Sequence, residues 1–331
     1  MMRGMKDEIL LRLREGNRVS GEELARAFGV TRTAVWKHIN ELRAAGYEID
    51  SSPSKGYLLI RTPDVPSPAE IKAGLGTHTF GKTLHFYPEL PSTQDEARAL
   101  AMQGAPEGTV VIAEAQTSGR GRIGRAWAAP PGGIYLSIIL RPAITPPEAL
   151  RFPLIAGVAV AQAIEEVTRL SPRLKWPNDV LISGKKVAGI LTEMNAEMDR
   201  LNFIIVGIGI NVNTPPENLP EELRATATTL AAESGRQIPR VKLVQALLAK
   251  FETLHDEFRK EGFEPIRRRW KALSETLGTM VTVTFADQQV HGRAFDIDQD
   301  GALLIQKWNG NLERVVAGDV SLRKAPTPWR G

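Results

Sequence analysis

The sequence predicts a multidomain α+β protein: a winged helix-turn-helix over residues 1–62, a mixed α/β domain over 69–276 and a small β-barrel over 277–331. Three observations support this prediction. Two capped helical patterns stand near the start, residues 63–68 form a proline-rich linker, and after Gly278 the apolar residues recur with a period of two. A chain of 331 residues is long enough to bury more than one core.

Composition excludes several classes of function. The chain has no cysteine, which rules out disulfides, thiolate catalysis and cysteine metal sites, and its five histidines form no metal-binding pattern. The charged start lacks the apolar core of a signal peptide, and no apolar run reaches the length of a membrane span. We therefore expect a cytoplasmic protein without a membrane partner. Its formal charge of +4 mildly favours anionic partners.

The first domain begins with two short helices around a glycine turn. Ser20 and Glu23 form a capping box, Thr31 can cap the second helix, and Gly46 ends it. Strands are expected at 47–49 and 57–60, joined by a wing at 50–56.

The second of these helices carries polar and basic side chains away from its apolar stripe. These side chains are Arg32, Thr33, Trp36, Lys37 and Asn40. Such residues can contact phosphates and base edges when a helix enters the major groove of DNA. A helical packing module with a solvated face is the alternative. The order of cap, turn, helix and wing favours DNA binding.

The rest of the chain supplies the two larger predicted domains. Strand-like runs alternate with helical patterns over 69–276, and the clearest helices are 152–170 and 241–259. The barrel strands are expected at 280–285, 290–297, 302–307, 312–316 and 320–323.

The segment from Gly119 to Trp127 carries three glycines and three arginines between two strand-like runs. Glycine permits close backbone approach, and arginine offers a planar fork of donors to carboxylate or phosphate. One arginine about 4 Å from a phosphate contributes roughly 4 kcal/mol of Coulomb attraction at an effective dielectric constant of about 20. We expect a loop that stays loosely ordered until an anion binds. A disordered RNA-binding tract and a surface loop without a ligand are the alternatives, and its position between apolar strands disfavours both.

A second motif spans residues 175–191. Two strands, 180–182 and 187–191, can pair around Ser183 and Gly184, which places Lys186 near the start of an apolar strand. Lys186 could extend to solvent, or it could stabilise a reacting carboxylate and phosphate. Asp179 could orient an incoming amine or merely cap a turn.

Two weaker signals complete the set. The strand-like run 206–213 has glycines that could let a ligand approach, or that could mark a bulge, and Asn211 offers an amide donor. Ser92, Thr93 and Gln94 start a helix whose free N–H groups could bind a small polar ligand. Taken alone, Ser92, Thr93 and Gln94 indicate only an ordinary helix cap.

Taken together, these motifs resemble the biotin protein ligases. The runs GRGRIGRAW, KWPNDV, KKVAGIL and GIGINVN stand in that family's order, and the resemblance extends from Ser92 through the C-terminal barrel. With the winged helix in front, the whole chain resembles the bifunctional subtype, which biotinylates a carrier and represses biotin genes. The resemblance implies a catalytic domain related to class II aminoacyl-tRNA synthetases and an Src-homology-3-like barrel.

The resemblance also implies chemistry and partners. Biotin and ATP would form biotinyl-5′-AMP with Mg²⁺, and biotin would pass to a lysine of the biotin carboxyl carrier protein. Operator DNA would bind the winged helix, and a homodimer would form when the adenylate is bound. Rival interpretations are a lipoate-protein ligase, a biotin-sensing transcription factor without ligase turnover, and a ligase whose winged helix no longer binds DNA.

Site residues follow from the same resemblance, and none is assigned as a metal ligand. The catalytic set is Lys186, Arg122 and Asp179. The biotin-binding set is Ser92, Thr93, Gln94, Gln116, Arg120, Gly121, Arg122 and Lys186. The ATP-binding set is Arg122, Arg125, Trp127, Lys175, Asn178, Lys186, Asn211 and Arg323. Gln94 departs from the family pattern, which usually has asparagine at this position.

Overall fold

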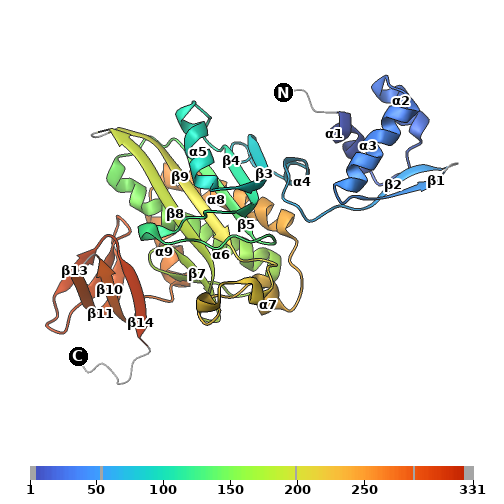
Figure 1. The fold of residues 1–331 in the computed structure, drawn as a ribbon. Helices are drawn as coiled ribbons and strands as arrows, with labels where there is room; N and C mark the ends of the chain where they lie inside the picture. The colour runs from blue at the N-terminus through green and yellow to red at the C-terminus, as the bar shows by residue number, and fades with distance from the viewer. Residues whose placement is uncertain (1–4, 53–54, 198–199, 286–287, 324–331) are drawn as a thin grey trace. The chain divides into compact units, whose positions relative to one another are not determined.

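A computed structural model describes residues 5–52, 55–197, 200–285 and 288–323 (Figure 1). The chain divides into two compact units, Met1–Val65 and Pro66–Gly331. Each unit is described by itself below.

The first unit contains three helices and a two-stranded antiparallel sheet. They are α1 (Met5–Leu13), α2 (Gly21–Phe28), α3 (Arg32–Ala44), β1 (Glu48–Ser52) and β2 (Gly56–Arg61). The predicted capping box is present, because Ser20 Oγ accepts from Glu23 N at 3.0 Å and Glu23 Oε2 accepts from Ser20 N at 3.3 Å. Thr31 caps α3 through the backbone N–H of Ala34, at 3.2 Å.

One local expectation in this unit is wrong. The predicted wing began at Asp50, whereas Asp50 and Ser51 lie within β1, opposite Leu58 and Tyr57. Polar residues are compatible with a strand here because a two-stranded ribbon leaves much of its surface in water. The connection between the strands is correspondingly shorter than predicted.

The second unit is built on a seven-stranded mixed sheet in the order β3-β4-β5-β9-β8-β7-β6 (Figure 1). Its strands are β3 (Leu84–Leu90), β4 (Val110–Gln116), β5 (Ile134–Leu140), β6 (Arg173–Lys175), β7 (Asp179–Ile182), β8 (Lys185–Glu197) and β9 (Arg200–Ile210). Only the β3–β4 pair is parallel among these strands.

Helices cover both faces of this sheet. The long helices α6 (Phe152–Thr168) and α8 (Arg240–Glu261) were both predicted, and they pack with each other in the main core. Helix α5 (Thr93–Met102) packs on the opposite face, where Ala97 and Ala101 meet Ile139 and Ile205. Alternate residues of β5 therefore face different cores, as the two-residue period of a strand requires. The short helices α4 (Pro68–Lys72), α7 (Leu230–Ser234) and α9 (Glu264–Leu273) complete the unit, and α4 begins on the last residue of the predicted linker.

The C-terminal strands form a five-stranded antiparallel sheet in the order β13-β12-β11-β10-β14. Their bounds are β10 (Met280–Phe285), β11 (Gln288–Ile297), β12 (Leu303–Gln306), β13 (Leu312–Val315) and β14 (Asp319–Arg323), each within two residues of the prediction. The sheet is linked to the β6–β7 edge of the seven-stranded sheet by Trp176, whose Nε1 donates to Gly301 O at 3.0 Å. Among the described residues, no helix is both long and apolar enough to cross a membrane.

Candidate functional site

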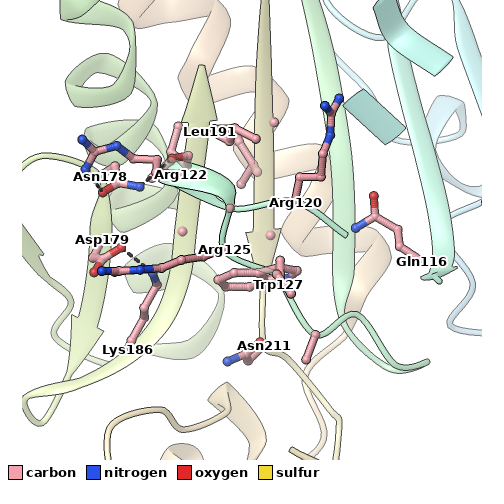
Figure 2. A pocket seen from close by; sticks show the side chains of 18 of the residues that line it. Gln116, Arg120, Arg122, Arg125, Trp127, Asn178, Asp179, Lys186, Leu191 and Asn211 are labelled. Carbon is pink, nitrogen blue, oxygen red and sulfur yellow. Dashed lines mark hydrogen bonds and ion pairs between the residues drawn. The ribbon is translucent and has the colours of Figure 1, made fainter. Parts of the chain in front are cut away.

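A cavity of about 250 Å³ lies on the sheet face that carries α5 (Figure 2). Most of the site residues predicted from the sequence line it, although they come from five separate segments. These residues are Ser92, Thr93, Gln94, Gln116, Arg120, Gly121, Arg122, Arg125, Trp127, Asn178, Asp179, Lys186 and Asn211.

Two predicted ATP-site residues are not among them. Lys175 does not line the cavity, because it lies on β6, the outermost strand, two positions beyond β8. Arg323 ends β14, where its backbone pairs with Met280, and its side chain lies outside what the structure describes.

The floor of the cavity consists of cross-strand rows on β5, β9 and β8. Gly209 lies opposite Tyr135 and Gly189, and Gly207 lies opposite Ser137 and Leu191. The sequence left open whether these glycines only marked a bulge. A Cβ at Gly209 would stand 2.6 Å from Trp127 Cε2, and a Cβ at Gly207 would stand 2.6 Å from Gln94 Oε1. The glycines let two side chains lie directly on the strand, so a larger residue at either position would displace Trp127 or Gln94.

The amino end of α5 forms the most buried wall. Ser92, Thr93 and Gln94 are all nearly inaccessible, and Ser92 caps the helix through Gln94 N at 3.3 Å. Gln116 Oε1 accepts from Thr93 N at 2.8 Å, which ties the end of β4 to the helix start. This wall offers hydroxyl and amide groups without a net charge, which suits a polar, uncharged part of a ligand.

The glycine-arginine loop, Gly119 to Trp127, folds back on itself in the structure. Gly121 N donates to Arg125 O at 2.7 Å and Trp127 N donates to Gly119 O at 2.8 Å. Two of its arginines pair with carboxylates of the protein. Arg120 pairs with Asp95, and Arg125 pairs with Asp319.

Figure 2 shows the three loop arginines extending in different directions, Arg122 toward Asn178, Arg125 toward Asp179, and Arg120 away from both. Arg122 Nη1 donates to Asn178 Oδ1 at 3.2 Å and to Gly318 O at 3.3 Å. Burial lowers the pKa of Arg122 from its ordinary value, while Asp319 and Asp179 oppose that change. The guanidinium group still keeps its proton at neutral pH, so Arg122 remains a cation.

Lys186 is placed as the hairpin predicted. β7 and β8 pair antiparallel around Ser183 and Gly184, which both have positive φ. The ammonium lies 2.5 Å from Asp179 Oδ1 and 5.4 Å from the centre of the Trp127 ring. Lys186 is therefore directed into the cavity rather than extended to solvent, and two cations, Arg122 and Lys186, line the same end. Such a pair can bind a phosphate and a carboxylate together.

Comparison with known proteins shows the family to which the chain belongs. Residues 87–211 match the biotin/lipoate A/B protein ligase family, residues 6–58 match an HTH domain, and residues 276–323 match the biotin protein ligase C terminal domain. The bifunctional ligase/repressor BirA of Bacillus subtilis is 43% identical over 319 residues, which are 96% of this chain and 98% of the relative. This chain belongs to the biotin protein ligase family. It is of the bifunctional subtype, because the similarity to ligase/repressors includes the helix-turn-helix unit.

More distant relatives are also biotin protein ligases or ligase/repressors. BirA of Escherichia coli is 30% identical over 322 residues, covering 96% of this ligase and 97% of the relative. A solved biotin protein ligase from Aquifex aeolicus, in complex with biotin and ATP, aligns with a TM-score of 0.63 and 32% identity. That alignment covers 74% of this ligase and 100% of the other chain.

Sequence reasoning missed one whole side of the ligase cavity. Leu219, Leu223, Thr226 and Ala227 line it from a segment without a recognisable motif. This segment is held against the β8 hairpin, because Lys186 N donates to Thr226 O at 2.8 Å. Its only signal is the proline-rich stretch at residues 215–220, which predicts a loop and no ligand.

Two further residues were missed and one was misplaced. Asp319 lines the cavity from the C-terminal sheet, and Glu193 contacts the loop through Arg120. Asn211 follows β9 instead of lying within a strand, and its Nδ2 donates to Thr228 O at 3.2 Å. The strand pattern predicted from 206–213 ends early because the side chain of Asn213 anchors the turn to Ile238.

The predicted DNA-binding residues lie together on α3 of the ligase. Arg32, Thr33 and Lys37 are exposed, and Trp36 keeps 55% of its surface accessible. Asn40 is half-buried, and its Oδ1 accepts from Arg43 at 3.4 Å. The face therefore presents cations and an aromatic ring to solvent.

Proposed function

We propose that this ligase joins biotin to a lysine of a biotin carboxyl carrier protein in two steps, at the cavity between α5 and the glycine-arginine loop. The observation that carries the proposal is the division of one cavity into two ends. Ser92, Thr93 and Gln94 give one end uncharged polar groups, and Arg122 and Lys186 give the other end cations. A ligand with a polar ring and an anionic tail, such as biotin, matches this division.

In the first step a biotin carboxylate oxygen would attack the α-phosphorus of ATP. A carboxylate–phosphorus bond forms, the bond to pyrophosphate breaks, and biotinyl-5′-AMP remains. Lys186 would touch the carboxylate and the α-phosphate, and Arg122 would face the same oxygens. Both cations offset the repulsion between two anions, which is strongest in the transition state. Arg120 and Gly121 would close over the product and keep water from the mixed anhydride.

In the second step the carrier amine would attack the acyl carbon, and the bond to AMP would break. Asp179 would orient the amine, since its carboxylate lies beside the Lys186 ammonium and on the floor next to Gly189. Removing the proton of the attacking amine is a task for which a nearby carboxylate is suited.

The nucleotide would occupy the end lined by Arg122, Arg125, Trp127, Asn178, Lys186 and Asn211. The described residues contain no group of three His, Cys, Asp or Glu side chains able to hold a metal ion. We therefore propose that Mg²⁺ arrives with ATP and is bound mostly by phosphate oxygens, as it commonly is. Lys175 does not line the cavity, so no contact supports a role for it in nucleotide binding. The proposed role of Arg323 rests on a side chain outside what the structure describes.

The finer architecture is part of the proposal. We propose that the second unit divides near residue 276 into a catalytic domain related to class II aminoacyl-tRNA synthetases and an Src-homology-3-like barrel. Operator DNA would bind α3, and binding of the adenylate would favour a homodimer that presents two recognition helices to a palindromic site.

The test is incubation with biotin, Mg-ATP and a biotin carrier domain, followed by mass measurement of the carrier. We expect a mass increase of one biotinyl group and biotin-dependent exchange of labelled pyrophosphate into ATP. Binding of biotin without pyrophosphate exchange would instead identify a sensor without turnover, and modification with lipoate in place of biotin would identify a lipoate-protein ligase.

A further inference from the structure

One hydrogen-bond donor and two cations, from two parts of the chain, lie around one carboxylate oxygen, Oε2 of Glu193. Gln94 Nε2 lies 3.0 Å from it, Arg98 Nη2 lies 3.1 Å from it and Arg120 Nη2 lies 3.5 Å from it. Gln94 and Arg98 belong to α5, while Arg120 belongs to the glycine-arginine loop. Glu193 itself is on β8, where it faces Ile205 of β9.

This carboxylate decides how the amide of Gln94 is oriented. An ionised carboxylate only accepts hydrogen bonds, so it must face the Nε2 group of Gln94. The Oε1 atom of Gln94 is thereby turned toward Ser137, whose Oγ donates to it at 2.9 Å. Because Gln94 lies over Gly207 in the cavity floor, its orientation sets which polar atoms the floor offers to a ligand. An asparagine at position 94 would be one methylene shorter, which makes this contact specific to glutamine.

The charge of Glu193 also needs an explanation. A carboxylate close to a site for two anions would repel both of them. Arg98 and Arg120 lie close enough to compensate that charge, and Arg120, which also pairs with Asp95, belongs to the loop. Closure of the loop and neutralisation of Glu193 are therefore linked.

We propose that Glu193 is a positioning residue that orients Gln94 for the substrate ring and holds the glycine-arginine loop closed through Arg120. Its effect on substrate binding rests on the proposed ligase function. Its effect on the loop is tested separately, through contacts between the protein's own side chains.

Hydrogen exchange of the ligand-free, full-length protein tests the loop contact. We compare the wild type with Glu193→Ala, Glu193→Gln and the control Glu166→Ala on α6, which removes an exposed ion pair with Lys250 of α8. Peptides covering 117–128 contain the bonded amides of Gly121 and Trp127. Both Glu193 variants should exchange there roughly two- to fivefold faster, the range for losing partly exposed ion pairs. Peptides elsewhere, and the control, should match the wild type.

Pyrophosphate exchange tests the effect on Gln94. Glu193→Ala should raise the KM for biotin about fivefold, as expected for one lost hydrogen bond. Glu193→Gln should raise the KM for biotin less than Glu193→Ala does, because an acceptor oxygen remains.

The proposal would be overturned if the 117–128 peptides of both Glu193 variants exchanged hydrogen at the wild-type rate, or if Glu166→Ala accelerated their exchange equally. If Glu193→Ala fails to fold, the measurements on Glu193→Gln test the proposal, since this variant keeps the side-chain volume. Absence of pyrophosphate exchange by the wild type would defeat the ligase function and leave the hydrogen-exchange result valid.

Discussion

Lys186 Nζ lies 2.5 Å from Asp179 Oδ1, across the two strands of a short hairpin. The tryptophan that ends the glycine-arginine loop lies beside the same ammonium, 5.4 Å from ring centre to nitrogen. The cation is thus fixed on two sides by the protein's own side chains. Preorganisation of this kind reduces the reorganisation that charge stabilisation would otherwise require.

Removal of this cation should affect the first chemical step. Lys186→Ala should slow formation of biotinyl-5′-AMP by roughly 10²- to 10³-fold, the range for losing one charge-stabilising donor. Single-turnover measurement of adenylate formation checks this. Lys185→Ala, at the exposed neighbouring position, is the matched control. A normal single-turnover rate in Lys186→Ala would remove Lys186 from the mechanism.

A methyl group on the cavity floor should displace the loop. Gly209→Ala would place a Cβ 2.6 Å from Trp127 Cε2, and relieving such an overlap costs about 1–3 kcal/mol. We expect adenylate affinity, measured by calorimetry, to fall about tenfold or more. Gly157→Ala is the control, since its Cβ would meet only Leu174 at an ordinary 3.6 Å. Equal affinities of the two variants would show that Trp127 does not cover the ligand.

The basic residues of α3 should contribute to DNA binding and not to ligation. Arg32→Ala and Lys37→Ala should each weaken binding to duplex DNA and lower the dependence of log K on log salt by about one. Fluorescence anisotropy over a salt series measures both quantities. Ligation should stay at the wild-type rate, and Lys242→Ala, on the exposed surface of α8, should change neither property. A parallel loss of ligation in the α3 variants would contradict independent action of the two units.

Glu252 should make the stability of the second unit depend on pH. Its carboxylate accepts from the backbone N–H groups of His78, Thr79 and Phe80 at 2.7, 2.6 and 3.0 Å. Burial raises the pKa of Glu252, but these three hydrogen bonds outweigh burial and hold the pKa below its ordinary 4.5. The folded form therefore binds its proton less readily than the unfolded form. The stabilisation is complete above pH 4.5 and is lost as the pH falls through the folded pKa.

Glu252→Gln should accordingly lower the free energy of unfolding at pH 7 by about 1–3 kcal/mol. The difference from the wild type should shrink below pH 4.5. Urea unfolding at several pH values measures both effects, with Glu166→Gln as an exposed control. A difference that is constant over the whole pH range would mean that ionisation of Glu252 does not contribute.

Short-range chemistry made much of the fold predictable. The caps at Ser20 and Thr31 and the hairpin at Ser183 and Gly184 depend on residues within four positions of one another, and each is present as predicted. The long helices α6 and α8 are similarly visible because apolar residues recur along them over many turns. The strand limits around Asp50 and Asn211 were less predictable, because backbone partners elsewhere in the chain decide where pairing stops.

The amino-acid sequence by itself determined the order of the units, the helix starts, and the groups that can do chemistry, namely the loop arginines, Lys186 and the polar start of α5. Only the tertiary structure decided that Gly207 and Gly209 lie beneath Gln94 and Trp127, and that Glu193 meets a residue 99 positions away. Local spacing encodes caps and turns, whereas these contacts depend on the register of β5, β9 and β8, which is set by packing of both faces of the sheet at once.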